Sequence, residues 1–327
     1  MITGLTYDLK TTYLQQGFSH EEVAEFDSEE TITGIEAALN ELGFRTERIG
    51  NIMELTRALA GNKRWDLVFN IAEGMYGIGR ESQVPALLDA FRISYVFSDP
   101  LVLSLTLHKG MAKHVVRGNG IPTAAFAVVK GEKDLKNIEL EYPLFIKPVA
   151  EGTGKGISRK SLINKTDELA VNAMELLHTY GQPVLVEEYL PGREFTVGIT
   201  GTGDAAKPCG IMEIVVRKKE EGQIYSLLNK ENYESRVAYS LPEKEITERC
   251  YEIALKSWNA LECRDGGRVD LRLDKHGVPN FIEVNPLAGL NPIHSDLPIL
   301  CRMNGISYTE LISMIMQSAL KRINHLK

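Results

Sequence analysis

The sequence predicts an α/β protein that begins with a parallel sheet covered by helices. Over residues 1–98, apolar runs of strand length alternate with segments of helical periodicity, the order found in doubly wound α/β units. From residue 194 onward, strand-like segments dominate until a helical segment over 246–261. With 327 residues, the chain is long enough for two or three modest domains that each bury a core.

In the first region, strands and helices alternate along the chain. Its predicted strands span 2–5, 44–49, 65–71 and 94–97, and its predicted helices span 29–42, 83–91 and a segment starting near 51. Asp27 or Ser28 can cap the helix over 29–42, and Gly43 ends it. Strands joined by helices lie parallel, so this region should form a parallel sheet with helices on its faces.

Two further regions combine strands with helices. A helical stretch over 100–117 leads through a turn with Gly and Pro to strands over 125–130, 144–148 and 184–189, with a helix over 167–180. The final region has strands after Glu194, the helix over 246–261 and an amphipathic helix over 307–323. We therefore expect an N-terminal α/β domain at 1–98, a central subdomain at 99–190 and a C-terminal subdomain at 191–327.

The composition argues against several classes of protein. Hydrophobic residues make up 43% of the chain and charged residues 25%, as in soluble globular proteins, and no apolar run approaches the ~18–20 residues of a membrane span. The formal net charge of -7 argues against binding to a nucleic-acid backbone. The N-terminus lacks the segments of a secretory signal and the four cysteines are scattered, so we expect reduced thiols and a cytoplasmic location.

Polar and apolar side chains alternate along two adjoining strands near the C-terminus. Arg268 and Asp270 share one face of the first strand, and Glu283 and Asn285 share one face of the second, since successive side chains point to opposite faces. If the strands pair through a turn at 275–277, two carboxylates, an amide and a guanidinium converge. Such hard oxygen ligands fit Mg²⁺ that carries a phosphate. The pattern alone leaves open an ordinary hairpin with a solvated polar face.

A glycine-rich segment follows a strand that ends in a lysine. The strand over 142–148 carries Lys147, and Gly152, Thr153 and Gly154 come shortly after it. Glycines allow backbone N–H groups to approach a phosphate closely, and the lysine adds a positive charge. The segment lacks the GxxxxGK[ST] pattern of a Walker A loop, so a flexible surface turn is the alternative.

A third polar cluster lies at the end of the apolar strand over 184–189. Glu187 and Glu188 fall in this strand, Leu190 follows it, and Glu194 comes just after a Pro-Gly turn. A strand end of this kind can offer backbone groups and one glutamate to an adenine edge, while a second glutamate reaches ribose hydroxyls. A charged hairpin without a ligand explains the same residues equally well.

Taken in chain order, these motifs resemble the signature of the ATP-grasp fold: the lysine and glycine-rich segment, the glutamate-rich strand, Lys230, and the RxD and ExNP strands. Within that fold, the chain closely resembles the D-alanine–D-alanine ligase family, most densely from about Phe69 to the C-terminus. The resemblance implies an N-terminal doubly wound parallel sheet, followed by central and C-terminal α+β subdomains that clamp ATP. It also implies an ATP-dependent, ADP-forming carboxylate–amine ligase that acts through an acyl phosphate.

The resemblance assigns the nucleotide site to residues from several segments. They are Lys109, Lys147, Gly152, Thr153, Gly154, Glu187, Glu188, Leu190, Glu194, Ile224 and Ile282. Among them, Lys109 and Lys147 are expected at the ATP phosphates and Glu194 at the ribose. Ile224 and Ile282 fall where the family sandwiches the adenine ring.

The same resemblance implies the metal and catalytic roles. The residues that match the family's metal ligands are Asp270, Glu283 and Asn285. Two Mg²⁺ ions are therefore expected, with Mn²⁺ as an alternative. Lys230 matches the family's mobile-loop lysine, which meets the γ-phosphate. Arg268 and the backbone N–H of Gly289 are expected to stabilise the oxyanion of a tetrahedral intermediate.

The chain departs from the family's pattern at the two substrate subsites. Glu73 stands where the family has a histidine, and Glu231 replaces the tyrosine that follows the mobile-loop lysine. Thr153 replaces the serine that pairs with that tyrosine. The Ser-Leu pair expected near the second carboxylate is Ser295-Asp296, after a one-residue insertion. These four differences leave the identity of the substrates open.

The family's N-terminal GGxSxE signature is also missing, and a longer acidic stretch over 21–27 follows that position. Asp296 in place of leucine and Glu231 in place of tyrosine add negative charge close to a site that binds anionic amino acids, which requires compensation. The cations that could supply it within the chain are Arg80, Lys155 and Arg272. A cationic or amine-bearing substrate is the second explanation, and solvated acids are the third.

Three functions follow from the sequence. The leading one is ligation of D-alanine to D-alanine for cell-wall precursors, and the second is a dipeptide or amide ligase with a different amino acid or amine. The third is a nucleotide-binding protein without catalysis, against which the full set of charged residues argues. Small amino acids or amines are the expected partners, without nucleic acid or membrane, and a homodimer is left open.

Overall fold

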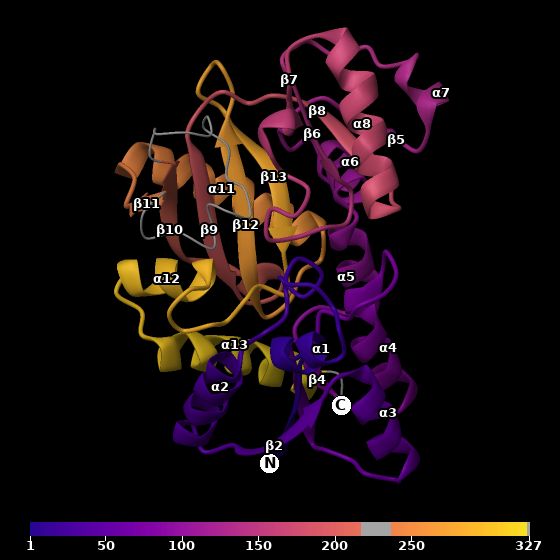
Figure 1. Cartoon of the computed structure of the whole chain (residues 1–327). Coiled ribbons are helices and arrows are strands. Elements are labelled where there is room, and N and C mark those ends of the chain that lie inside the picture. The colour runs from indigo at the N-terminus through magenta and orange to yellow at the C-terminus, as the bar shows by residue number, and fades with distance from the viewer. Residues whose placement is uncertain (217–236, 326–327) are drawn as a thin grey trace.

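The structure is a computed structural model that describes residues 1–216 and 237–325. Its described part contains three sheets (Figure 1). In Figure 1 the N-terminal sheet lies at the bottom, the sheet that contains β5 to β8 lies at the upper right, and the sheet that contains β9 to β13 lies at the upper left. The fold is the expected mixed α/β arrangement.

The N-terminal sheet is parallel throughout, which confirms the predicted doubly wound unit. Its strand order is β2-β1-β3-β4. The strands are β1 (Ile2–Thr6), β2 (Arg45–Gly50), β3 (Leu67–Asn70) and β4 (Tyr95–Val96), and the long helices are α2 (Glu29–Glu41), α3 (Ile52–Ala60) and α4 (Gln83–Ala90). Ser28 caps α2 by accepting from the Thr31 N–H, and Asn51 forms a capping box with Glu54 at α3.

The helix predicted over 100–117 is two helices, so that prediction was wrong. They are α5 (Pro100–Leu107) and α6 (Lys109–Gly118), and His108 between them has non-helical dihedral angles. The His108 imidazole accepts a hydrogen bond from the Met111 N–H at 3.2 Å and thereby caps α6. The Lys109 N–H donates to the Val149 carbonyl, which fixes the start of α6 against the strand that carries Lys147.

The second sheet is antiparallel, with the strand order β5-β8-β6-β7. Its strands are β5 (Phe126–Val129), β6 (Leu144–Pro148), β7 (Leu162–Ile163) and β8 (Val184–Glu188). The short helix α7 (Glu132–Leu135) follows β5. The longer helix α8 (Thr166–Tyr180) packs its buried Leu169 and Ala173 against one face of the sheet.

The third sheet is also antiparallel, with the order β11-β10-β9-β12-β13. Its strands are β9 (Glu194–Thr200), β10 (Lys207–Val216), β11 (Val237–Ser240), β12 (Gly266–Leu273) and β13 (Pro279–Asn285). The helix α11 (Lys244–Ala260) covers one face through the fully buried Trp258. The helix α12 (Asp296–Met303), which the sequence did not predict, covers the other face.

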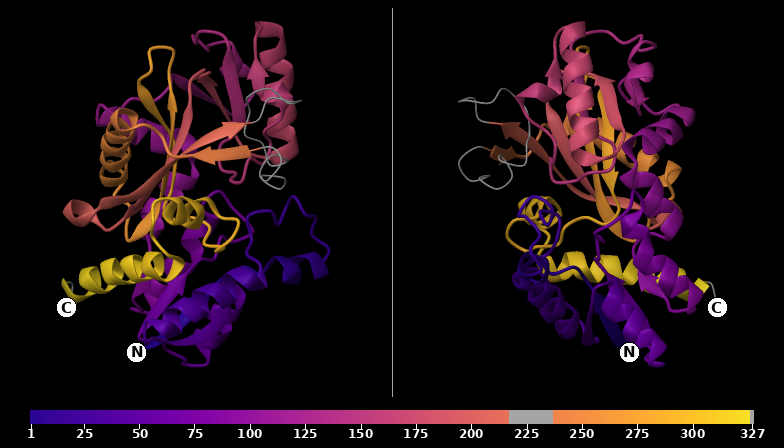
Figure 2. Two further views of the ribbon diagram at one scale, coloured as in Figure 1. Left: turned by 90° about the vertical axis from the view of Figure 1, so that its left-hand side faces the viewer. Right: turned by 45° about the vertical axis from the view of Figure 1, so that its right-hand side comes forward.

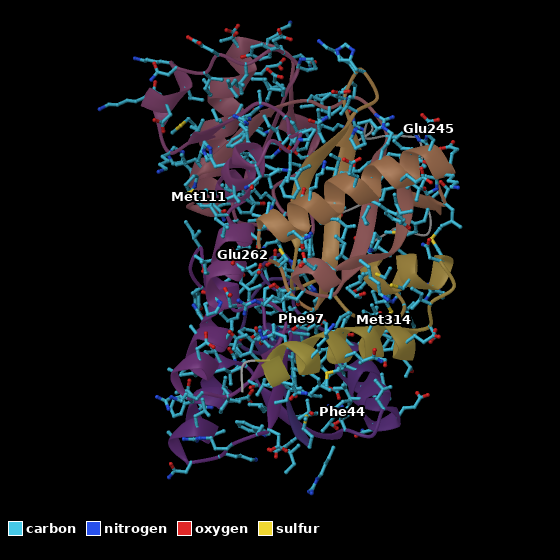
Figure 3. All side chains as sticks on the ribbon, turned by 180° about the vertical axis from the view of Figure 1, so that it is seen from behind. Phe44, Phe97, Met111, Glu245, Glu262 and Met314 are labelled. Atoms are coloured by element: carbon cyan, nitrogen blue, oxygen red, sulfur yellow. The ribbon has the colours of Figure 1, made fainter. Side chains whose placement is uncertain are left out.

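The last helix, α13 (Tyr308–His325), lies against the N-terminal region, as both views of Figure 2 show. One hydrophobic core contains residues of β1, α2, α12 and α13. Phe97 belongs to this core, and Phe44 and Met314 pack against it, near α13 in Figure 3. The chain ends are therefore held together in one core. The division at residues 1–98, 99–190 and 191–327 stays a prediction.

Two expectations from composition can be compared with the described residues. None of the helices within 1–216 and 237–325 has the length and apolar character needed to cross a membrane. The four cysteines, Cys209, Cys250, Cys263 and Cys301, are buried free thiols, and the Sγ atoms of Cys209 and Cys301 lie 3.6 Å apart.

Candidate active site

Two cavities meet where the three sheets come together. The first, here called the nucleotide cavity, has a volume of about 800 Å³ including its open mouth and lies between the second and third sheets. The other, here called the acceptor cavity, has about 1200 Å³ and lies between the N-terminal region and the ends of β12 and β13. Arg268 and Glu283 line both cavities. A group transferred between the two cavities would pass these side chains.

The strands β12 and β13 bring the predicted polar residues together. In the antiparallel register, Arg268 lies opposite Asn285 and Asp270 lies opposite Glu283, with an irregularity directly after Asp270. The Thr196 hydroxyl donates to Asp270 Oδ1 at 2.9 Å, and Asn285 Nδ2 lies 3.5 Å from Asp270 Oδ2. Two carboxylates and an amide thus share one face of the hairpin, as the alternation predicted.

Arg268 is the cation beside these carboxylates. Its Nη1 forms an ion pair with Asp270, and its Nη2 lies 3.9 Å from Asp296 Oδ2. Burial raises the pKa of Asp270, Arg268 opposes this effect, and the Glu283 carboxylate adds to it. A divalent cation between Asp270 and Glu283 would relieve their repulsion. The residues present therefore fit a Mg²⁺ ion that also binds phosphate oxygens.

A buried row of charges begins at the lining of the nucleotide cavity with Lys147 and Glu187 and ends at Lys113 behind it. Lys147 Nζ lies 3.0 Å from one oxygen of Glu187, and Lys113 Nζ lies 2.8 Å from the other. Burial disfavours the Glu187 carboxylate, but the Lys113 and Lys147 ammonium groups outweigh burial and lower its pKa to about 2. Glu187 therefore holds Lys147 in place, and with this geometry its carboxylate is occupied by two lysines.

Lys113 was not predicted as a site residue, although the sequence contains a signal for it. It lies four residues after Lys109 in α6, so both side chains leave the same face of the helix. Lys113 is fully buried and also donates to the Thr123 hydroxyl at 2.7 Å. Lys109 donates to the Glu151 carbonyl at 2.6 Å, and its Nζ lies 3.5 Å from Glu283 Oε2. Lys109 therefore lies at the junction of the two cavities.

Apolar side chains form the walls of the nucleotide cavity. They are Phe145, Ile157, Leu190, Ile214 and Ile282. Such walls fit a planar base, with polar groups at its edge. Ile282 and Leu190 were predicted, whereas Phe145, Ile157 and Ile214 were not, because only the folded sheets bring them together.

The polar end of the nucleotide cavity carries Glu194 and Glu188. Arg272 Nη1 lies 3.2 Å from Glu194, and its Nη2 donates to the Tyr189 hydroxyl at 3.0 Å. Glu188 also lines the cavity, and its carboxylate accepts from the Glu141 N–H at 3.1 Å. The Glu188 side chain is thus held by the backbone of Glu141, while Glu194, which also lines the cavity, is held by Arg272.

The glycine-rich loop contributes to both cavities. Gly154 lines the nucleotide cavity, whereas Gly152 and Thr153 line the acceptor cavity. The Gly152 N–H donates to the Glu25 carboxylate. Thr153 has a φ of 49°, and its buried hydroxyl has no hydrogen-bond partner within the described part of the chain. The loop thus presents one unused hydroxyl group beside the junction of the cavities.

The second subsite predicted near the C-terminus lies beside Gly289. Ser295 and Gly289 line the acceptor cavity, and a Cβ at Gly289 would lie 2.8 Å from Ser295 Oγ. Ser295 Oγ accepts from the Asn291 N–H at 3.0 Å. Asp296 is absent from the cavity lining and faces Arg268 and Tyr239 instead. The extra acid at 296 therefore acts on the guanidinium of Arg268.

An acidic wall lines the acceptor cavity on the side of the N-terminal region. Its members are Glu25, Asp27, Glu73 and Glu81. Burial, together with the nearby Asp8, raises the pKa of Asp27 to about 7. Burial raises the pKa of Glu81 to about 8, with Glu25 adding to the effect and Arg80 opposing it. Burial and the neighbouring Glu81 and Glu25 raise the pKa of Glu73 as well. Only Glu73 was predicted from the sequence.

Of the three cations expected to compensate the added acids, Arg80 pairs with a member of the acidic wall, and the other two pair outside it. Arg80 pairs with Glu25, Lys155 with Glu151, and Arg272 with Glu194. None of the three lines the acceptor cavity. The cations that do line it are Lys10, Lys109 and Arg268.

Three of the predicted site residues cannot be placed. Ile224, Lys230 and Glu231 fall within residues 217–236, outside the described residues. Their assignments to the adenine ring, the γ-phosphate and the acceptor subsite stay predictions.

Known proteins resemble this chain in sequence and in fold. Residues 115–317 match the family model described as the C-terminus of D-ala D-ala ligase. The chain belongs to the D-alanine–D-alanine ligase family. It is therefore an ATP-using ligase of ATP-grasp fold that forms C–N bonds from small amino acid substrates.

Several curated relatives of this family match most of the chain. The D-alanine–D-alanine ligase of Bordetella petrii is 30% identical over 88% of this chain and 83% of its own length. The D-alanine–D-alanine ligase of Aquifex aeolicus is 31% identical over 85% of this chain and 90% of its own length. A protein of Sinorhizobium fredii named y4sG is 31% identical over 78% of this chain and 75% of its own length.

Solved structures show the same fold at lower identity. The D-alanine–D-alanine ligase of Bacillus anthracis in complex with ATP has a TM-score of 0.72 and 22% identity, over 100% of both chains. The VanG D-Ala:D-Ser ligase of Enterococcus faecalis has a TM-score of 0.75 and 21% identity, over 97% of this chain and 99% of its own.

Proposed function

We propose that the protein joins the carboxylate of one amino acid to the amine of another, with D-alanine as the leading substrate for both positions. The observation that carries the proposal is the cross-strand set of Arg268, Asp270, Glu283 and Asn285 at the junction of two cavities. The nucleotide cavity has apolar walls and buried lysines, and the acceptor cavity is polar. Relatives named D-alanine–D-alanine ligase support the choice of substrate.

Mg²⁺ is the metal that we propose for this site, with Mn²⁺ as an alternative. Asp270, Glu283 and Asn285 would hold it, and the nucleotide phosphates would complete its coordination. Hard oxygen donors of this kind suit both ions. When bound, the metal neutralises phosphate charge during phosphoryl transfer.

The residues at the junction have distinct tasks in the proposed first step. A substrate carboxylate oxygen attacks the γ-phosphorus, the bond from that phosphorus to the β–γ bridging oxygen breaks, and ADP and an acyl phosphate result. Lys109 and Lys147 lie where they can oppose the charge of the phosphates, and Glu187 keeps Lys147 oriented. Positioning and charge stabilisation supply most of the catalysis in phosphoryl transfer.

The second step forms the new bond on the acceptor side. An amine nitrogen attacks the acyl carbon, loses a proton, and inorganic phosphate leaves. The guanidinium of Arg268 and the backbone N–H of Gly289 are placed on this side, where they can stabilise the oxyanion of the tetrahedral intermediate. Ser295 is the group proposed to bind the carboxylate of the second amino acid.

A second candidate is a ligase whose amine substrate carries an additional positive charge. Asp27, Glu73 and Glu81 of the acidic wall favour it, because buried carboxylates with raised pKa values bind a cation in place of protons. A diamine or a basic amino acid has the required chemistry.

The cellular setting follows from the same proposal. A reaction that uses ATP, together with four buried free thiols, favours the cytoplasm. The net charge of -7 disfavours a nucleic-acid partner. A homodimer is proposed on the family resemblance alone.

The release of ADP in the presence of Mg·ATP tests the choice of substrate. We expect turnover with D-alanine alone, at a rate at least about 10-fold above that with L-alanine. The panel also includes D-serine, diamines, and D- and L-lysine, each paired with D-alanine. Turnover with a diamine or lysine and none with D-alanine alone would reject D-alanine as the amine substrate and select the second candidate.

A further inference from the structure

Asp296, the first residue of α12, is a largely buried carboxylate that faces the guanidinium of Arg268. Its Oδ2 lies 3.9 Å from Arg268 Nη2, and its side chain is only 10% exposed. The linings of the nucleotide cavity and of the acceptor cavity do not include Asp296. The family's pattern has a leucine at this position, so the acid is a departure from that pattern. Asp296 therefore acts on Arg268 from outside the space that the substrates fill.

A hydroxyl group at the edge of the third sheet holds Asp296. The Tyr239 hydroxyl of β11 donates to Asp296 Oδ1 at 3.3 Å, while the other carboxylate oxygen faces Arg268. β11 is an edge strand, and the strands β10 and β9 lie between it and β12, which carries Arg268. The carboxylate thus contacts side chains from both ends of this strand series, which fixes its direction toward the guanidinium.

Arg268 lies between two carboxylates, one at each terminal nitrogen. Its Nη1 pairs with Asp270, and its Nη2 faces Asp296. Burial lowers the pKa of the guanidinium, but the carboxylates of Asp270, Asp296 and Glu283 outweigh burial and raise that pKa. The guanidinium also lines both cavities. Arg268 is therefore charged and is held from two sides at the junction of the cavities.

A metal ion at the proposed site competes with Arg268 for Asp270. One oxygen of Asp270 accepts from the Thr196 hydroxyl, and the other pairs with Arg268. A divalent cation bound to the same carboxylate repels the guanidinium, because two cations then share one anion. Asp296 offers the guanidinium a second anion that lies outside the proposed metal site. Arg268 can thus yield Asp270 to the metal and stay beside the acceptor cavity.

The same contact connects two parts of the acceptor side. Ser295, the residue directly before Asp296, is the group proposed to bind the carboxylate of the second amino acid, and it lines the acceptor cavity. Arg268 is the group proposed to stabilise the oxyanion of the tetrahedral intermediate. The contact of Asp296 with Arg268 therefore fixes the oxyanion group relative to the carboxylate subsite.

We propose that Asp296 is a positioning residue, a second counter-ion of Arg268 that keeps the guanidinium directed at the acyl oxyanion while a metal ion occupies Asp270. The inference rests on the proposed function, because Arg268 has an oxyanion to stabilise only if an amine attacks an acyl phosphate. Since Tyr239 holds Asp296, the arrangement consists of three side chains, from β11, α12 and β12.

Steady-state kinetics of Asp296→Asn, with the best substrate of the panel, test this role. The variant keeps the size of the side chain and the oxygen that accepts from Tyr239, but it loses the charge. We expect kcat to fall about 10-fold, because small misplacements of a catalytic group have effects of at least this size. The KM for Mg·ATP should stay within about twofold of the wild type, since Asp296 lies outside the nucleotide cavity.

Asp167→Asn is the control for the loss of a carboxylate at a helix N-terminus. Asp167 lies in the first turn of α8, is exposed, and lines neither of the two cavities. Its replacement removes the same favourable charge from the start of a helix without a change near Arg268. The kcat and KM of Asp167→Asn should therefore equal those of the wild type.

A double-mutant cycle with Arg268→Met separates an effect through Arg268 from a general structural effect. Arg268→Met alone should lower kcat by about 10²–10³-fold, the usual loss for one oxyanion donor. If Asp296 acts through Arg268, adding Asp296→Asn to Arg268→Met changes kcat by less than about twofold, because the two residues then act as one unit.

Binding of Mn²⁺ in the presence of ADP supplies a measurement that does not depend on turnover. In Asp296→Asn the guanidinium has lost one of its two carboxylate partners and competes more strongly for Asp270. The Kd for Mn²⁺, measured by electron paramagnetic resonance of the free ion, should therefore rise about 10-fold. In the Arg268→Met background the same substitution should change this Kd by less than about twofold.

Each outcome has a clear meaning. Equal kcat for Asp296→Asn and the wild type overturns the inference, as does an unchanged Kd for Mn²⁺ or a 10-fold loss of kcat that persists in the Arg268→Met background. If the wild type releases no ADP with any substrate of the panel, the proposed function fails instead. The Mn²⁺ measurements then still decide whether Asp296 draws Arg268 away from Asp270.

Discussion

Asp270→Asn and Glu283→Gln each lower the rate of ADP formation by about 10³-fold or more, while the protein stays folded. Both carboxylates lie opposite each other on β12 and β13, at the junction of the two cavities. Loss of either charge removes a ligand of the proposed Mg²⁺ and with it part of the charge stabilisation of the transferring phosphoryl group. ADP release and Tm are measured for both variants.

Asp274→Asn is the matched control for these two variants. Asp274 lies in the turn of the same hairpin, where its carboxylate accepts from the His276 and Val278 N–H groups, outside both cavities. An asparagine oxygen can accept the same bonds, so ADP formation should stay within about twofold of the wild type. Undiminished activity of Glu283→Gln would contradict the proposed metal site.

Glu187→Ala produces the largest expected loss of stability. It leaves the Lys113 and Lys147 ammonium groups buried without their shared carboxylate, and breaking a buried ion pair in this way costs about 3–5 kcal/mol. The free energy of unfolding should fall by that amount, which corresponds to a decrease in Tm of about 10 °C. Glu188→Ala, one residue further along β8 at the cavity rim, should change the free energy of unfolding by less than about 1 kcal/mol.

The pH dependence of the free energy of unfolding tests the ion pairs of Glu187 with Lys113 and Lys147. The pKa of Glu187 is about 2 in the folded protein, below its unfolded value of about 4.3, so its stabilising contribution is full above pH ~4. That contribution is lost as the pH falls through the window from ~4 to ~2. In urea titrations, wild-type stability should therefore decrease more steeply over this window than that of Glu187→Ala. Parallel curves would show that Glu187 is not held by the two lysines.

The hairpin of β12 and β13 was predictable because it depends on local rules. Alternation of side chains places Arg268 with Asp270 and Glu283 with Asn285, and a short turn makes the two strands neighbours. The parallel N-terminal sheet was predictable for a similar reason, since strands separated by helices lie parallel. These features require no knowledge of distant contacts.

Other parts of the site depend on contacts between distant segments. Glu25, Arg80 and Gly152 are separated by 55 and 72 positions in the sequence, and no periodicity relates them. Ile214 and Phe145 line one cavity only after the second and third sheets pack together. The break of the predicted helix at His108 depends on a side-chain cap, for which helical periodicity gives no signal.

The ion pairs formed by the candidate compensating cations were not predictable from the sequence either. The sequence named Arg80, Lys155 and Arg272 as cations that could offset the added acids, and the structure pairs each with a different glutamate. Within the acidic wall, Arg80 pairs with Glu25, and the cations that line the acceptor cavity itself are Lys10, Lys109 and Arg268. Sequence alone could not distinguish these arrangements, because ion pairs between distant segments leave no pattern in it.

Transfer of ¹⁸O from the substrate carboxylate to inorganic phosphate tests the central claim most directly. The amino acid that supports turnover is supplied with ¹⁸O in its carboxylate, together with Mg·ATP, and the released phosphate is examined by mass spectrometry. An acyl phosphate predicts one ¹⁸O atom in each phosphate, because the carboxylate oxygen that attacks phosphorus stays with it when the amine attacks carbon. Unlabelled phosphate, or AMP in place of ADP, would contradict the proposed mechanism.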